Sequence, residues 1–187
     1  MQAPQSPDAA ERIFLPLLRS KTNIVLTGMP GCGKSAVGRI LAKELGRELL
    51  DTDAVVTEMT GLTPAQLIEE RGEPAFRDVE GQAVADCAKR TGCIIATGGG
   101  AVLRPENIAA LRQNGTIFFR DRDLEDIKPS GDRPLSKDRE ALRRRYEERY
   151  GIYCVTADHI IRHTSTAAAA AAAILEVFHE LTDHQRP

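Results

Sequence analysis

Residues 23–46 read NIVLTGMPGCGKSAVGRILAKELG, and this stretch decides the fold. It opens with a short β-branched run that ends in glycine, and from residue 35 its apolar residues recur at helical spacing until Gly46. Between these two parts, GMPGCGKS (28–35) matches the pattern G-x-x-x-x-G-K-[ST] at every fixed position. A strand, a glycine-rich loop and a helix in this order predict a binding site for nucleotide phosphates.

The loop has the chemistry that a nucleoside triphosphate requires. Its glycines let successive backbone N–H groups turn toward one point, and the N-terminus of the following helix adds partial positive charge there. We expect Lys34 to reach the β- and γ-phosphates and the Ser35 hydroxyl to bind Mg²⁺. The predicted ATP-binding residues are Gly28, Met29, Pro30, Gly31, Cys32, Gly33, Lys34, Ser35 and Ala36.

The alternation of strands and helices continues along the chain. The pattern predicts strands at 48–53, 93–97, 116–120 and 158–162, and helices at 63–71, 73–91, 105–113, 139–149 and from about 166. The seven alanines at 167–173 suit one face of the last helix, because Ala is the best helix former. Alternating β and α elements predict a three-layer α/β/α domain whose parallel sheet is covered on both faces.

The composition narrows the class of protein. The chain has 187 residues, of which 42% are hydrophobic, so we expect one domain over 23–187 and assign 1–22 to a polar N-terminal extension or a linker remnant. Four cysteines without a CxxC pair suit a reducing cytoplasm, and no run approaches the roughly 18 apolar residues of a membrane span. A net charge of -2 and the absence of Trp disfavour a nucleic-acid partner. We therefore expect a cytoplasmic protein with small-molecule substrates and neither a nucleic acid nor a membrane as partner.

The phosphate loop by itself leaves the phosphoryl acceptor open. The guanine-reading patterns N-K-x-D and T-K-x-D are absent, which favours a small-metabolite kinase over a GTPase. Asp51 and Asp53 lie at the end of one predicted strand and the triplet Gly98–Gly100 follows another, at the edge where open parallel sheets bind their ligands. Either acid taken alone can be a turn former or a helix cap. Taken together with the loop, these residues predict one crevice for two substrates.

Two further features suit the acceptor side. Arg77, within GEPAFRDVE, offers a guanidinium fork that matches a carboxylate, although a lone arginine on a helix is more often solvated. Segment 121–138 is polar, contains its own Gly and Arg, and interrupts the alternation. Such a segment is typical of a lid that closes over the substrates, because excluding water protects ATP from hydrolysis.

In combination, these residues resemble the shikimate kinase family. The resemblance spans about residues 23–181 and is carried by GMPGCGKS, LLDTD (49–53), the G-E-x-x-F-R-x-x-E of 72–80, ATGGGAV (96–102) and DRPLS (132–136). It implies a five-stranded parallel sheet of the nucleoside-monophosphate-kinase type and a monomer. It also implies phosphorylation of the 3-hydroxyl of shikimate by ATP with Mg²⁺.

The resemblance implies roles for individual acceptor-side residues. Asp53 matches the aspartate that binds the acceptor hydroxyls and can serve as base, and Asp51 matches the acid that acts with Ser35 on Mg²⁺. Arg77 and Arg149 match arginines that hold the substrate carboxylate. The triplet Gly98, Gly99 and Gly100 matches the residues that form the floor of the substrate site. Arg133 matches the lid arginine near the transferred phosphoryl group. The expected catalytic residues are Lys34, Asp53 and Arg133.

Two segments depart from the family pattern. Gly151 stands where the pattern R-x-P-x-Y after Arg149 has proline, which predicts a freer local backbone. Residues 126–129 replace an R-T pair that packs near adenine, and Lys128 is a different kind of cation from an arginine. Two alternatives stay open: a kinase for another carboxylated polyol such as gluconate, or a non-catalytic, nucleotide-dependent sensor of shikimate-like ligands.

Overall fold

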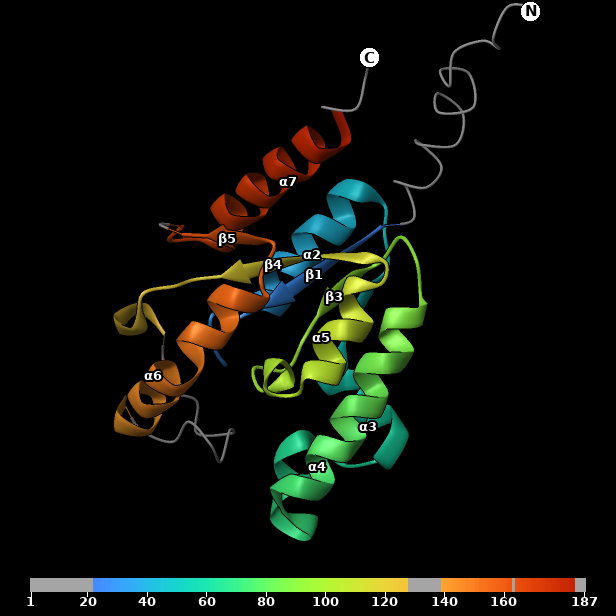
Figure 1. The fold of residues 1–187 in the computed structure, drawn as a ribbon, viewed down its shortest axis with the longest axis vertical. Helices are drawn as coiled ribbons and strands as arrows, with labels where there is room; N and C mark the ends of the chain where they lie inside the picture. The colour runs from blue at the N-terminus through green and yellow to red at the C-terminus, as the bar shows by residue number, and fades with distance from the viewer. Residues whose placement is uncertain (1–21, 128–138, 163, 184–187) are drawn as a thin grey trace, which may run out of the picture.

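The computed structural model describes residues 22–127, 139–162 and 164–183, so most of the predicted extension lies outside it. Its centre is a sheet of five parallel strands in the order β2-β3-β1-β4-β5 (Figure 1). The strands are β1 (Asn23–Thr27), β2 (Leu49–Asp51), β3 (Ile94–Ala96), β4 (Gly115–Arg120) and β5 (His159–Ile161). The predicted three-layer fold with a five-stranded parallel sheet is confirmed.

The connections between strands are helical. The helices are α2 (Lys34–Leu45), α3 (Thr52–Thr60), α4 (Pro64–Lys89), α5 (Pro105–Arg112), α6 (Arg139–Thr156) and α7 (Ala167–Asp183), with 3-10 turns η1 (Ala101–Leu103) and η2 (Leu124–Asp126). Thr63 caps α4 as predicted: its hydroxyl accepts the N–H of Gln66, and the Gln66 side chain accepts the N–H of Thr63. Thr166 caps α7 with its hydroxyl, which accepts the N–H of Ala169.

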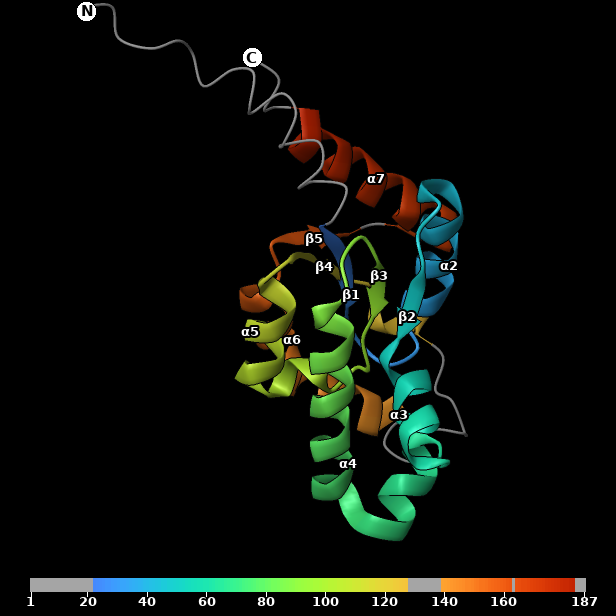
Figure 2. The same cartoon turned by 90° about the vertical axis from the view of Figure 1, so that its right-hand side faces the viewer.

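Helices cover both faces of the sheet (Figure 2). On one face, α2 and α7 pack against the buried side chains of Leu26 and Phe118. The alanine run belongs to this layer, because Ala170 and Ala171 are buried and allow α7 to approach closely. On the other face, α4, α5 and α6 cover the sheet, and Tyr153 of α6 is fully buried there. Burial on both faces explains why the strands read as continuous apolar runs.

A smaller apolar cluster joins α3 to α4. It consists of Val56, Leu67, Phe76 and Ala83 and lies beside the main sheet. Within α4, Gly72 has φ 85° and ψ 162°, so the helix breaks between its two halves. The cluster bridges this break, since Leu67 precedes Gly72 and Phe76 follows it. The two halves predicted at 63–71 and 73–91 are therefore held together by packing.

Two of the differences from the predicted boundaries bear on the site. The strand predicted at 48–53 ends at Asp51, because the Asp51 carboxylate caps α3 by accepting the backbone N–H of Asp53 at 3.1 Å. The helix predicted at 139–149 continues to Thr156, with Gly151 in its interior. Burial of Tyr153 in the core holds this extra length, since tertiary packing supplies most helical stability in proteins.

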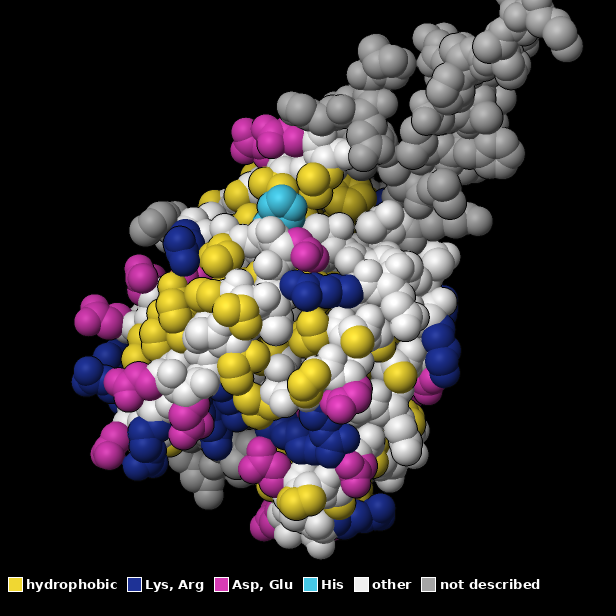
Figure 3. All heavy atoms as spheres, viewed as in Figure 1, with side chains coloured by type: hydrophobic (Ala, Val, Ile, Leu, Met, Phe, Trp, Pro, Cys, Tyr) yellow, Lys and Arg dark blue, Asp and Glu magenta, His cyan; other side chains and the backbone are white. Residues whose placement is uncertain are grey.

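The surface carries both signs of charge. Figure 3 shows acidic and basic side chains interspersed over the visible face, in keeping with the small net charge. Several arginines instead lie inside the molecule: Arg77, Arg120 and Arg149 are each at most 9% exposed. No helix in the described ranges has the length and apolar character to cross a bilayer.

Candidate active site

The phosphate loop follows β1 at the carboxyl end of the sheet, as predicted. Gly28, Gly31 and Gly33 have φ of 143°, 82° and 95°, which glycine adopts without strain. The Lys34 ammonium is buried in the loop and donates hydrogen bonds to the carbonyl oxygens of Gly28 at 2.8 Å and Met29 at 3.0 Å. Neutral oxygens therefore hold this positive charge, and a phosphate can replace them with a charge-assisted bond.

Ser35 and Asp51 meet between the loop and β2. The Ser35 hydroxyl donates to Oδ2 of Asp51 at 2.6 Å, and Oδ1 accepts the N–H of Asp53. Oxygen ligands of this kind suit Mg²⁺, which in kinase sites takes one or two carboxylates and fills its shell with phosphate and water. The described residues contain no cluster of three His, Cys, Asp or Glu, and this mode of binding needs none. The residues present fit the predicted magnesium site.

Asp53 lies against the first glycine of the triplet. A β-carbon at Gly98 would lie 2.8 Å from Oδ1 of Asp53 and 2.7 Å from Oε1 of Glu80. The N–H of Gly98 donates to the Thr52 hydroxyl at 2.8 Å, which fixes the triplet to the start of α3. Burial raises the pKa of Glu80; the ion pair with Arg77 opposes this rise, and the nearby charge of Asp53 adds to it. Two carboxylates from α3 and α4 therefore converge on Gly98.

The rest of the triplet joins the two halves of the site. A β-carbon at Gly99 would lie 2.6 Å from Cδ of Pro30 in the phosphate loop. A β-carbon at Gly100 would overlap the guanidinium group of Arg77. Residues without side chains are what allow the loop and the arginine to approach this closely. The structure thus brings the phosphate loop, Asp53 and Arg77 to one place, as the sequence predicts.

Arg77 lies between two carboxylates on its own helix. Nη1 contacts Oε2 of Glu80 at 2.6 Å, and Nη2 contacts Oε1 of Glu73 at 2.8 Å. Glu80 is buried, whereas the Glu73 side chain is 44% exposed at the first position after the Gly72 break. Burial lowers the pKa of Arg77, but the ion pairs with Glu80 and Glu73 outweigh it and leave the pKa raised.

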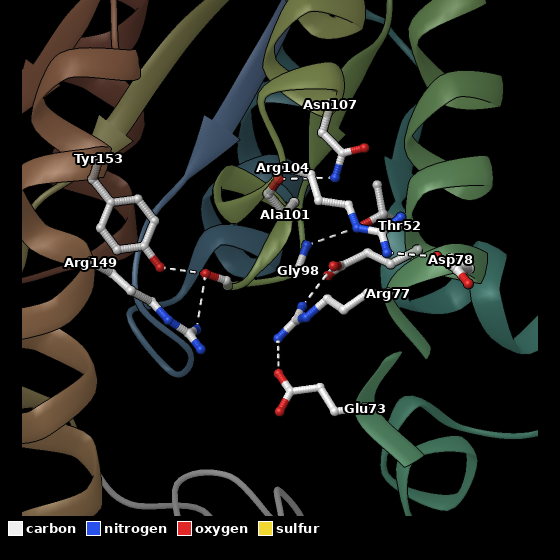
Figure 4. A network of polar contacts seen from close by, with 12 residues as sticks. Thr52, Glu73, Arg77, Asp78, Gly98, Ala101, Arg104, Asn107, Arg149 and Tyr153 are labelled. Atoms are coloured by element: carbon white, nitrogen blue, oxygen red, sulfur yellow. Dashed lines mark hydrogen bonds and ion pairs between the residues drawn. The ribbon is translucent and has the colours of Figure 1, made fainter. Parts of the chain in front are cut away.

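Arg149 approaches the triplet from the opposite side. Its Nη1 donates to the carbonyl oxygen of Gly99 at 3.3 Å, and the Tyr153 hydroxyl donates to the same oxygen at 2.5 Å. Figure 4 shows Arg149 and Arg77 pointing toward one another from α6 and α4. The Arg149 side chain is buried, and its Nε has no hydrogen-bond partner within the described ranges. Two guanidinium groups therefore face one space beside the acids and the phosphate loop.

Known proteins share this arrangement of sequence and fold. Residues 30–179 match the family model described as shikimate kinase. The chain belongs to the shikimate kinase family. The shikimate kinase of Clostridium beijerinckii is 44% identical over 147 residues, which cover 76% of this chain and 86% of that protein.

Solved structures of the family agree with the fold. The shikimate kinase of Acinetobacter baumannii in complex with shikimate is 28% identical, with a TM-score of 0.82 over 92% of this chain and 99% of that one. The shikimate kinase of Aquifex aeolicus is 30% identical, with a TM-score of 0.75 over 86% of this chain and 98% of that one. The P-loop kinase fold that the resemblance over residues 23–181 implies is therefore confirmed.

Some predicted site residues of this shikimate kinase family member lie outside the residues that the structure describes. Arg133 and Lys128 both lie within 128–138, together with most of the predicted lid. Gly151, which predicts a freer backbone beside Arg149, lies inside α6, and apart from the nearby helix backbone no atom of the described residues stands within 4 Å of its β-carbon position. Arg149 is therefore aimed by a continuous helix.

The structure also adds residues that the sequence reasoning missed. Glu80 and Glu73 pair with Arg77 at helical spacings of three and four, which was a readable signal. Tyr153 follows Arg149 by four residues, which places both on one face of α6. Arg145, one turn before Arg149, has its pKa lowered by burial and by the charge of Arg149. This side of the site is thus more strongly positive than the motifs alone indicate.

Proposed function

We propose that this family member phosphorylates shikimate, transferring the γ-phosphoryl group of ATP to the 3-hydroxyl. The observation that carries the proposal is the pair of buried arginines, Arg77 and Arg149, on either side of a glycine triplet that touches the phosphate loop. Two guanidinium groups at one place suit the single carboxylate of a small acceptor. Shikimate, the ligand of the Acinetobacter baumannii relative, carries such a carboxylate.

The acceptor carboxylate enters a site in which Arg77 already forms ion pairs with protein carboxylates. Nη2 of Arg77 is bonded to the half-exposed Glu73, whereas Nη1 is bonded to the buried Glu80. Glu73 is the weaker competitor, because its side chain is half-exposed and water screens its charge, whereas Glu80 is buried. The acceptor therefore takes the place of Glu73 on Arg77 and completes the hydrogen bonding of Arg149. Both arginines then fix the ring with one hydroxyl directed at the phosphate loop.

Asp53 acts on that hydroxyl. Its carboxylate lies at Gly98, between the acceptor side and the loop. Asp53 orients the acceptor hydroxyl in line with the γ-phosphoryl group and accepts its proton late, because the transition state of phosphoryl transfer is loose. Gly98, Gly99 and Gly100 form the floor over which the acceptor lies, and alignment rather than covalent chemistry supplies most of the rate.

The nucleotide side neutralises charge. Residues 28–36 hold ATP, and Lys34 moves its hydrogen bonds from the carbonyls of Gly28 and Met29 to the phosphates. Ser35 and Asp51 hold Mg²⁺, which when bound supplies positive charge to the phosphate oxygens. Arg133 closes over the transferred group as part of the lid at 121–138. We also propose that residues 23–187 act as one domain in a cytoplasmic monomer.

Coupled measurement of ADP release tests the proposal, with shikimate, quinate and gluconate as acceptors. Shikimate is expected to give a higher kcat/KM than the open-chain gluconate, since the two arginines hold a ring carboxylate and thereby fix the ring hydroxyl that reacts. Faster turnover of gluconate would assign the chain to polyol kinases. Binding of ATP without acceptor-stimulated ADP release would favour a nucleotide-dependent sensor.

A further inference from the structure

Arg120 is a buried arginine that none of these steps uses. It ends β4 and is 2% exposed. Phe118, two residues earlier, is buried on the sheet face covered by α2 and α7. Because alternate residues of a strand lie on the same face, the Arg120 side chain enters the layer between the sheet and α2. It does so at the strand end where the phosphate loop passes into α2.

Two glycines of the phosphate loop lie against Arg120. A β-carbon at Gly28 would lie 2.8 Å from the carbonyl oxygen of Arg120. A β-carbon at Gly33 would overlap Nη1, and its distance to Cζ would be 3.4 Å. Gly33 immediately precedes the first residue of α2, where backbone N–H groups and the helix dipole favour anions. The guanidinium group therefore lies against the part of the loop that is built for phosphate.

Two hydrogen-bond donors of the Arg120 guanidinium group have no acceptor among the described residues. Nε and Nη1 are buried, and neither has a hydrogen-bond partner among the residues that the structure describes. Burial lowers the pKa of Arg120; the Cys32 thiol opposes this change, and the charge of Arg122 adds to it. Nε of Arg122 is also buried without a partner in the described ranges. A buried guanidinium without an acceptor is costly, so these groups indicate an anion that completes the site.

We propose that Arg120 is a nucleotide-binding residue whose Nε–H and Nη1–H donate to the phosphate chain of ATP held by residues 28–35. The inference rests on the nucleotide site of the proposed function. A planar guanidinium fork fits two phosphate oxygens at once. The phosphate chain is also the anion that comes nearest to Gly33. Arg120 thus complements Lys34, the two cations approaching the loop from different elements.

The test compares the wild-type protein with Arg120→Met by calorimetric titration of two probes, MgADP and magnesium tripolyphosphate. Each lost charge-assisted hydrogen bond predicts a rise in Kd, so both probes are expected to bind about 10- to 100-fold more weakly. The melting temperature of the ligand-free variant is expected to stay the same or to rise, because an unpaired buried charge is removed. The KM for the acceptor is expected to be unchanged.

Two variants serve as controls. Arg112→Met removes an exposed arginine that contacts Thr156 and Asp158, and both Kd values should match the wild type. Arg120→Lys keeps the charge without the fork, so a smaller loss of affinity is expected.

Three results overturn the inference. Unchanged affinity for both probes, or a lower melting temperature of the ligand-free variant, would make Arg120 a structural residue. A loss of affinity for MgADP but not for tripolyphosphate would place Arg120 on the nucleoside rather than the phosphates. If the wild-type protein bound neither probe, the nucleotide site of the proposed function would itself be wrong.

Discussion

The acceptor side and the nucleotide side of the site hold their positive charges in different ways. On the acceptor side, Arg77 is bonded to two carboxylates, those of Glu80 and Glu73. On the nucleotide side, Lys34 is bonded to carbonyl oxygens, and two buried donors of Arg120 have no partner in the described part of the chain. A buried cation without a counter-charge costs free energy until an anion binds. The nucleotide side thus suits a polyphosphate, and the acceptor side a single carboxylate.

Arg149 lies between these two cases. It touches the triplet on the acceptor side, yet its partner is the carbonyl oxygen of Gly99, and its Nε has none among the described residues. Arg77 is therefore positioned by acids, whereas Arg149 is positioned by α6 and its own burial. The two arginines that are expected to share one substrate carboxylate should respond differently to mutation.

The largest effect is expected from Asp53→Asn, which tests whether the acceptor side acts in the chemical step. Loss of the base should lower kcat about 10²- to 10⁴-fold, with the KM for ATP little changed. Steady-state kinetics measures both, and Asp78→Asn, at an exposed acid on α4, is the matched control. A near-normal kcat would exclude this role for Asp53.

Arg77→Met and Arg149→Met test whether the arginine held by acids and the arginine held by its helix respond differently to mutation. Each should lower kcat/KM for shikimate about 10- to 100-fold, because each removes a charged hydrogen bond to the carboxylate. Arg77→Met should also lower the free energy of unfolding by about 3 kcal/mol, since Glu80 would stay buried without its partner. Arg149→Met should leave the free energy of unfolding unchanged or raise it. Equal losses of stability in urea denaturation would contradict the contrast.

Glu73→Gln tests whether the second carboxylate on Arg77 competes with substrate. Removing the charge of this half-exposed side chain should lower the KM for shikimate about two- to fivefold, with kcat unchanged. Glu69→Gln, at an exposed position on the same helix, should leave the KM at its original value. A higher KM in Glu73→Gln would mean that Glu73 aligns Arg77 for substrate rather than competing with it.

Gly151→Ala should have the smallest effect. Gly151 lies inside α6, and beyond the nearby helix backbone the described residues leave open space at its β-carbon position, so alanine should stabilise the protein by about 0.5–1 kcal/mol. If the helix already aims Arg149, the KM for shikimate should not change. Thermal denaturation and steady-state kinetics check the two halves of this prediction, and an altered KM would show that backbone freedom at Gly151 matters.

The pair Asp51 and Asp53 shows how far sequence reasoning reaches. Their position at the end of an apolar strand predicts that both acids lie at the carboxyl ends of the strands, where ligands bind. It leaves open whether the two side chains contact the same ligand. The structure places Asp51 on Ser35 and Asp53 at Gly98, because the strand ends at Asp51 and α3 begins at once. Only the geometry of this strand-to-helix turn separates the two side chains. Alternation along a strand would have put both on one face.

The sequence by itself determined the phosphate loop, the α/β alternation and the glycine triplet. These features depend on local properties: the φ that glycine permits, the period of the apolar residues and helix capping. Tertiary structure alone decided that Arg77 and Arg149 meet at the glycine triplet, that α6 runs on through Gly151, and that Arg120 lies against Gly33. Those facts depend on which elements the parallel crossovers bring together and on what burial leaves unpaired, and no local pattern records either.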